Sequence, residues 1–446
     1  MSEYASILIE NLSLYTFRNY LDENIVSLLF SNYDLHVVEN YKDDPADDPA
    51  DEDAEMYTKY EYKTTVKKAV ERLEALGYSI NNISSCFNTN VFTAIDYGAF
   101  LHHLHIRNSD DIESTIHERI EKKVTFQKWR NAIKKIVNYE LVHGSISSKM
   151  ENEVTDEISI TTECDKIIYY ALLDRESQSY YALFPDMINQ ACVIRMLLEY
   201  CPPEDEIVLD FSFLQYWTED SIQKALMATE SNEKTIVLVE GTSDKAILDF
   251  SLKTIYPHLS DLFYFMDFDD KNGARDGGTS YVVKNMKTFY FSKIRSRFIA
   301  IFDNDAEGYY SKCQLLNSIK TWPNNFRILL YPENHFFDSY PTLAPNGTIV
   351  NDNINRKACS IELYLPDKVL QADGKYYPIE WEARRKIVNT DGKEEALYQG
   401  VILHKSEIKA NFFDYMKSIE NKKAHFNPDE WKRMKGLLDS IVFAFT

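Results

Sequence analysis

The feature that most constrains the fold is a regular alternation of short apolar runs with helix-length polar segments, which begins near Lys234. The apolar runs predict strands at residues 235–239, 262–267, 298–302 and 326–331. The segments between them predict helices at about 244–255, 280–294 and 307–319. Strands and helices that alternate in this way form right-handed crossovers around a mainly parallel sheet. We therefore expect an α/β domain over 231–446, whose active site forms at the carboxyl ends of the strands.

Carboxylates follow two of these predicted strands. Glu240 ends the first strand, and Asp244 falls in the first turn of the next helix, where the helix dipole favours an anion. The apolar run 298–302 leads directly into Asp303 and Asp305, whose alternate positions allow both side chains to point to one side. The sequence thus predicts that four carboxylates face a common crevice.

A cluster of this kind favours a bound cation. Four carboxylates would repel one another in a partly desolvated crevice, and a divalent cation removes that repulsion. Oxygen ligands without a nearby His or Cys cluster favour Mg²⁺ or Mn²⁺, which keep positions open for phosphate oxygens. A structural turn at Asp303 and Asp305, and a plain helix-start role for Asp244, are the alternatives. Glu307 and Glu362 are interpreted as a helix-start acid and a surface residue.

The first 230 residues give weaker signals. Apolar residues at helical spacing predict an amphipathic helix over 64–77, and long charged and apolar segments predict a mainly helical region over 91–230. Dense charge with proline predicts a solvated acidic loop at 43–55, inside an N-terminal domain over 1–90. These signals predict a mixed, largely helical region ahead of the α/β domain.

The net charge limits how the chain can bind nucleic acid. The chain carries 70 acidic and 49 basic residues, a formal charge of -21, and eight of the acids lie in 43–55. Binding to a polyanion would therefore depend on local basic patches and bound cations. No run approaches the roughly 18 apolar residues that span a bilayer. We therefore expect a cytoplasmic protein with no membrane contact. The six cysteines form no CxxC pair, so we expect neither a zinc site nor a disulfide framework.

Two motifs carry a resemblance to a known family. VLVEGTSD followed by FDNDAEG resembles the Toprim domain shared by topoisomerases, primases and OLD-type nucleases, with Glu240 matching its glutamate and Asp303 and Asp305 its DxD pair. YASILIENLSLYTFRN, KTTVKKAVERLEALGY, YPTLAPNG, CSIELYLP and YQGVILHKSEI resemble HEPN/Toprim-associated proteins of bacterial anti-phage defence, so the similarity covers nearly the whole chain. No arginine is followed at four to six residues by the histidine that HEPN ribonucleases use.

The resemblance implies a role for one lysine. OLD-type nucleases use a lysine downstream of the acidic site, for which Lys405 is the best match and Lys409 the second choice, with a surface lysine as the alternative. A positive group beside the scissile phosphate offsets charge that develops in the transition state. We expect a Mg²⁺- or Mn²⁺-dependent phosphodiester hydrolase. Its expected catalytic residues are Glu240, Asp303, Asp305 and Lys405, and its expected metal ligands are Glu240, Asp244, Asp303 and Asp305.

DNA is the expected substrate, with tRNA or another structured RNA as the alternative. A non-catalytic sensor or scaffold of a defence complex is a third hypothesis, favoured if the acidic cluster binds no metal. Topoisomerase and primase functions are disfavoured because the chain lacks room for their additional domains. No GxxxxGK[ST] motif occurs, so an ATPase partner would be another chain. Homo-oligomer formation is left open.

Overall fold

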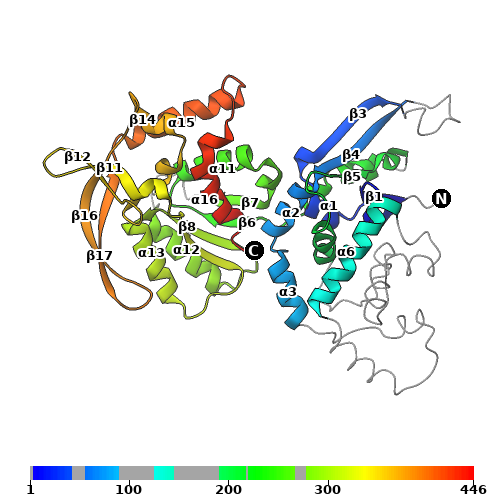
Figure 1. Cartoon of the computed structure of the whole chain (residues 1–446), viewed down its shortest axis with the longest axis horizontal. Helices are drawn as coiled ribbons and strands as arrows, with labels where there is room; N and C mark the ends of the chain where they lie inside the picture. The colour runs from blue at the N-terminus through cyan, green and yellow to red at the C-terminus, as the bar shows by residue number, and fades with distance from the viewer. Residues whose placement is uncertain (1–3, 43–55, 90–124, 145–189, 217–218, 267–277) are drawn as a thin grey trace, which may run out of the picture. The chain divides into compact units, whose positions relative to one another are not determined.

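A computed structural model describes residues 4–42, 56–89, 125–144, 190–216, 219–266 and 278–446. Its contacts divide the chain into two units, Met1–Asn232 and Glu233–Phe445 (Figure 1). The predicted acidic loop at 43–55 lies outside the described residues. Within the described parts of the chain, no helix combines the length and the apolar character needed to cross a membrane.

The first unit is built on a five-stranded antiparallel sheet with the order β2-β1-β5-β4-β3. The strands are β1 (Tyr4–Ile9), β2 (Leu12–Arg18), β3 (Leu35–Tyr41), β4 (Tyr57–Thr65) and β5 (Glu206–Asp210). In β1 and β5 every second side chain is buried, as expected for a sheet with one face on the core. The prediction of a largely helical region was therefore incomplete, because none of these strands was identified from the sequence.

Helices cover the core side of this sheet. They are α1 (Glu23–Leu29), α2 (Val66–Ala75), α3 (Ile80–Thr89), α6 (Phe126–His143), α9 (Gln190–Leu198) and α10 (Glu219–Leu226), with short 3-10 turns η1 (Asn32–Asp34), η4 (Ser212–Tyr216) and η5 (Ala228–Glu230). The predicted helix over 64–77 is confirmed as α2. Thr65 caps it by accepting a hydrogen bond from the Lys68 backbone N–H, and Gly77 follows with a left-handed φ of 87°.

The second unit contains a four-stranded parallel sheet with the order β10-β8-β6-β7. The strands are β6 (Thr235–Leu238), β7 (Phe263–Met266), β8 (Phe298–Phe302) and β10 (Phe326–Leu330), and the helices between them are α11 (Thr242–Ile255), α12 (Thr279–Phe291) and α13 (Ala306–Ser318). All four predicted strands and all three predicted helices are confirmed, with ends shifted by a few residues. The α/β character of this region is therefore confirmed.

Strand β8 lies in the middle of the second unit's core. All five of its side chains are buried, which requires cover on both faces of the sheet. Phe298, Ala300 and Phe302 pack against Met286 of α12 and Leu315 of α13, which lie side by side in Figure 1. The alternate residues of β8 face the other side of the sheet.

The rest of the second unit adds a second four-stranded sheet, of mixed direction, and three more helices. The sheet has the order β12-β11-β16-β17, and the long antiparallel hairpin β16–β17 is drawn in orange in Figure 1. The strands are β11 (Tyr340–Leu343), β12 (Ile349–Asp352), β16 (Ile379–Val388) and β17 (Glu394–Ile402), with the two-residue pairs β9 (Asn304–Asp305) with β13 (Ala358–Cys359) and β14 (Gln371–Ala372) with β15 (Lys375–Tyr376). The helices are α14 (Asp367–Leu370), α15 (Lys405–Glu420) and α16 (Lys432–Val442), with 3-10 turns η6 (Pro257–Leu262), η7 (His335–Ser339), η8 (Ile361–Tyr364) and η9 (Pro428–Trp431).

Candidate metal centre

The strand order places two of the predicted carboxylates at a topological switch point. The chain passes from β6 to β7 on one side of β6, and then through α12 to β8 on the other side. Crevices at the carboxyl ends of parallel strands open where the order reverses in this way. Glu240 follows β6 and Asp303 follows β8, so both lie at this reversal. They are joined directly, because the Asp303 backbone N–H donates to Glu240 Oε1 at 3.1 Å.

Glu240 and Asp303 are both poorly solvated and close to other negative charges. Burial raises the pKa of Glu240 to about 8, and the charge of Asp305 adds to the increase. Burial also raises the pKa of Asp303 well above its usual range, with Glu240 and Asp305 as the next causes. Asp303 Oδ1 is buried and has no hydrogen-bond partner among the described residues. A buried carboxylate oxygen left in this state is costly unless a cation neutralises it.

Asp305 has a second, structural task at the start of α13. Its Oδ1 accepts the Gly308 backbone N–H at 2.7 Å, which caps the helix, and its Oδ2 accepts from Gln399 Nε2 at 2.8 Å. Burial raises the pKa of Asp305, and these two hydrogen bonds oppose that increase. Position 308 has to be glycine, because a Cβ there would lie 2.1 Å from the Asp303 carbonyl oxygen. The first turn of α13 is thus pressed against the DxD backbone.

Asp244 lies in the first turn of α11, as predicted, and is 8% exposed. Its pKa is raised, mainly by burial, while the charge of Lys409 opposes the increase. Asp244 Oδ1 is 3.9 Å from Lys409 Nζ, and that ammonium group also donates to Ser243 Oγ at 2.6 Å. Asp244 therefore belongs to a part of the site that already contains a positive charge.

Glu362 is the acid that completes this part of the site. Its Oε1 lies 3.0 Å from Lys409 Nζ, its Oε2 lies 3.3 Å from Lys405 Nζ, and Ser360 Oγ donates to Oε2 at 2.5 Å. Burial favours protonation of Glu362, but the two lysines outweigh it and lower its pKa. The interpretation of Glu362 as a surface residue was wrong, since its exposed fraction is 0%. Its burial depends on the contacts that lysines of α15 make with it, which local sequence does not reveal.

Lys405 and Lys409 reach the site together because they lie one turn apart at the start of α15. A lysine in the first turn of a helix is disfavoured by the helix dipole, so its carboxylate neighbours must offset that effect. Burial opposes the charge of Lys405, but Glu362, Asp303 and Asp244 raise its pKa and keep it protonated. Among the described residues Lys405 pairs with Glu362 alone, whereas Lys409 contacts Glu362, Ser243 and Asp244.

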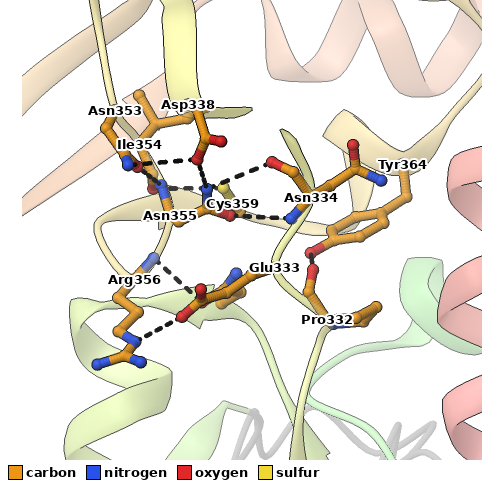
Figure 2. Close-up of polar contacts among 11 residues, drawn as sticks. Pro332, Glu333, Asn334, Asp338, Asn353, Ile354, Asn355, Arg356, Cys359 and Tyr364 are labelled. Atoms are coloured by element: carbon orange, nitrogen blue, oxygen red, sulfur yellow. Dashed lines mark hydrogen bonds and ion pairs between the residues drawn. The ribbon is translucent and has the colours of Figure 1, made fainter. Parts of the chain in front are cut away.

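The backbone between the two aspartates is fixed from outside the parallel sheet. Asn304 is 1% exposed, and its Oδ1 accepts the Arg356 backbone N–H at 3.0 Å, while β9 pairs with β13. Figure 2 shows the polar network that holds the segment around Arg356 in place. Asn355 donates from Nδ2 to Asp338 Oδ1 and to the Asn334 carbonyl, and Arg356 Nε donates to Glu333 Oε1 at 2.7 Å. The DxD segment therefore has a rigid support on its outer side.

The donor set suits a hard cation, although the structure does not bring the acids into a closed cage. Within the described residues, no three His, Cys, Asp or Glu side chains converge on one metal position. Mg²⁺ does not require such a cage, since it is often held by one or two carboxylates with waters and substrate phosphates. The partnerless Asp303 Oδ1 beside Glu240 and Asp305 fits this type of ligation. Asp244 and Glu362 form a second acidic pair, in which Lys409 supplies the positive charge.

Several participants were not found from the sequence. Glu307 begins α13 as predicted, but its backbone N–H also donates to Gln399 Oε1, so Gln399 links β17 to both Glu307 and Asp305. Tyr331 directly follows β10 and is 2% exposed. Burial raises the pKa of Tyr331 well above its usual range, and the negative charge of Asp303 is the next cause. It therefore remains a neutral wall of the site. The one available signal was its position as the last residue of the predicted strand 326–331.

Comparison with known proteins identifies the first unit. A family model described as HEPN/Toprim N-terminal domain 1 matches residues 1–230, which is more than half of the chain. No curated protein and no solved structure matches the chain. The match supports the resemblance to HEPN/Toprim-associated proteins, and it ends before the unit that carries the carboxylates. The chain therefore belongs to the HEPN/Toprim N-terminal domain 1 family.

Proposed function

We propose that the second unit is a Toprim-type, OLD-like nuclease domain that cleaves phosphodiester bonds of DNA with Mg²⁺ or Mn²⁺. The observation that carries this proposal is the partnerless, buried Asp303 Oδ1 at the switch point between β6 and β8. Glu240 and Asp305 raise the pKa of Asp303 further, so this group of acids is stable as anions only with added positive charge. Nucleic acid brings phosphate oxygens that can complete the coordination of a hard cation.

Each group has a distinct task in the proposed reaction. Asp303 and Glu240 would hold the cation together with water and phosphate oxygens, Asp305 would add its charge beside them, and Asp244 would assist a second cation. When bound, the cation supplies Lewis-acid stabilisation of the phosphoryl oxygens. Glu240 uses Oε1 to accept the Asp303 N–H, which leaves its other oxygen to orient the attacking water.

Lys405 is the preferred lysine for the transition state. It pairs with Glu362 alone among the described residues and is 39% exposed at its side chain, so its ammonium group can turn toward a phosphate. Lys409 is held by Glu362 and Ser243 and is less exposed, at 22%. A positive group that approaches the scissile phosphate stabilises the charge that builds up there. Lys409 then serves to hold Asp244 and Glu362 together.

The biological setting is proposed from the family and from the resemblance. Membership in a HEPN/Toprim family supports a nuclease-related, defence-associated protein, and we propose a role in anti-phage defence. An ATPase or another defence protein is the proposed partner, and any ATPase would be a separate chain because this sequence has no P-loop. The first unit would then recognise the partner or the trigger.

The test is incubation of purified protein with parallel pools of DNA and RNA, each with Mg²⁺, Mn²⁺ or a chelator. We expect metal-dependent cleavage of DNA that a chelator abolishes. Asp303→Asn should lower the rate about 100-fold or more, because it removes a ligand charge but keeps the shape. Asp414→Asn is the matched control, since it makes the same substitution at a side chain of α15 that is 79% exposed to solvent. Cleavage of RNA alone would establish a ribonuclease, and inertness on both pools would favour the scaffold.

A further inference from the structure

A groove lies at the opposite end of the parallel sheet from the carboxylates. Its floor is formed where β8 and β10 begin, since the Phe298 backbone N–H donates to the Asn325 carbonyl and Phe326 lines the groove. Its volume is about 540 Å³. The five residues of β8 separate it from Asp303 by roughly 16 Å at about 3.3 Å per residue. The groove is therefore a surface distinct from the candidate metal centre.

The segments around the groove carry only positive charge, in contrast to the chain as a whole. No Asp or Glu occurs between Asp276 and Asp303, a stretch that contains five Lys and Arg residues. None occurs between Glu307 and Glu333 either, where there are three. The exposed cations here are Lys284, Lys293, Arg295 and Lys320, and among the described residues none of them forms an ion pair with a carboxylate. In a chain of net charge -21 this is a local patch of positive charge, the kind of surface that attracts a polyanion.

The groove also presents an aromatic ring to solvent. Phe291, at the end of α12, is 72% exposed and lines the groove, and its ring centroid is 5.2 Å from that of Tyr290. Tyr290 is in turn held edge-on by Trp322 at 5.4 Å. Phe291 therefore stands on a rigid aromatic base with one side open. An exposed ring of this kind can stack on an unpaired nucleobase, which a duplex does not offer.

The backbone of the groove is fixed in advance. Asn325 Nδ2 donates to the carbonyl groups of Ile294, Arg295 and Ser296, which holds the turn after α12. Lys293 adopts a left-handed φ of 54°, a conformation that glycine prefers and lysine does not. Lys284, Lys287 and Phe291 are spaced by three and four residues, so they share one face of α12 that leads to the groove.

We propose that this groove binds single-stranded nucleic acid, with Lys293 and Arg295 on phosphates and Phe291 stacked on a base. The proposal goes beyond the proposed cleavage, because the binding requires neither the carboxylates nor a metal. Single strands without sequence preference are bound by this combination of a basic groove and a stacking ring. The groove would retain a strand independently of the metal centre at the other edge of the sheet.

The test is fluorescence anisotropy of a labelled oligothymidylate with the full chain in chelator, against a duplex of the same length. We expect the single strand to bind more tightly than the duplex. Phe291→Ala should weaken binding about 5-fold or more, and Phe291→Leu should weaken it similarly because leucine cannot stack. Lys293→Gly should lower the slope of log affinity against log salt by about 0.7, with the fold intact since glycine suits this φ. Lys417→Ala, a 71% exposed lysine of α15, should change neither quantity.

Equal binding of the parent and Phe291→Ala would overturn the proposal, as would an unchanged salt slope in Lys293→Gly. Binding of polyglutamate in place of the oligonucleotide would also overturn it, in favour of an acidic protein partner. The outcome is separate from that of the cleavage test. A protein that binds single strands through Phe291 but cleaves no nucleic acid would support the groove proposal and contradict the proposed nuclease. A protein that cleaves DNA but binds single strands equally well after Phe291→Ala would support the nuclease and contradict the groove proposal.

Discussion

The two units treat a buried glutamate in opposite ways. Glu61 of β4 is 5% exposed and lies between Lys59 at 3.2 Å and Lys63 at 3.0 Å. Burial favours its protonation, yet the two lysines lower its pKa. Glu240 in the second unit has carboxylates as neighbours instead, and its pKa is raised to about 8. Glu61 is neutralised by lysines of its own unit, as Glu362 is in the second unit, whereas the acids around Glu240 lack such partners and need a cation from outside.

Other buried ions of the first unit follow the same pattern. Arg195 is 4% exposed and donates to Glu74 Oε1 at 2.7 Å and to Glu199 Oε2 at 2.9 Å. Arg72 is fully buried and donates to the Ser27 carbonyl at 2.7 Å. These contacts give each of the two buried arginines an acceptor within the first unit. The candidate metal centre instead gathers buried acids whose pKa values are raised, as functional sites often do.

The largest expected effect is on the pH dependence of stability without metal. A raised pKa means that the folded chain holds a proton on Glu240 that the unfolded chain releases above its ordinary value of 4.5. The contribution of Glu240 to the free energy of unfolding is therefore fully present below pH 4.5 and is lost as the pH rises to about 8. The free energy of unfolding should fall by about several kcal/mol over this range.

Urea denaturation from pH 4 to 9 in chelator measures this effect, with Glu240→Gln as the matched variant that cannot titrate. The parent should lose stability relative to the variant as pH rises, and Mg²⁺ should flatten the difference. Parallel pH curves for the two proteins in chelator would contradict the assignment of a strained acid to Glu240.

The next effect tests the paired charges of the first unit. Arg195→Met should destabilise the first unit by about 3 kcal/mol, because Glu74 and Glu199 lose a buried partner. Lys224→Met is the matched control in the same unit, since its pair with Asp220 is exposed at both side chains and should leave the free energy of unfolding nearly unchanged. Urea denaturation measures both. Equal losses in the two variants would show that burial does not distinguish the pairs.

The smallest expected effect concerns the acidic segment 43–55. The structure does not describe these residues, so the loop remains a prediction from its charge and prolines. Deletion of the segment should change the free energy of unfolding by less than about 0.5 kcal/mol. A thermal melt of the deletion variant measures this, and a large loss of melting temperature would show that the segment packs against the first unit.

The sequence predicted the parallel sheet of the second unit well because its signals are local, but it did not predict the mixed sheet β12-β11-β16-β17. Each strand of the parallel sheet is a short apolar run, and β8 is buried on both faces, so its run is continuous up to Asp303. The antiparallel sheet of the first unit was missed for a different reason. β5 pairs with β4, which lies far away in the sequence, so nearness along the chain does not identify the pair. β3 is mostly exposed, so it has no buried face that an apolar alternation would reveal.

The site shows the same division between local and distant information. Glu240, Asp244, Asp303 and Asp305 were found because they follow strands or begin helices. Glu362 was missed because it lies on the short turn η8, and only its contacts with α15 make it a buried partner of the lysines. Its apolar neighbours in CSIELYLP, which are all buried, were the available signal.

Asp303 is the residue whose buried charge most needs a metal, and thermal melts of Asp303→Asn with and without Mg²⁺ measure that need. Without metal the variant should be at least as stable as the parent, because it relieves repulsion among buried carboxylates. The parent should gain about 2.7 kcal/mol from Mg²⁺ at 100 times its dissociation constant, and the variant clearly less. A variant that is less stable than the parent in chelator, yet gains as much from Mg²⁺ and still cleaves DNA, would show that Asp303 is a structural turn residue and not a metal ligand.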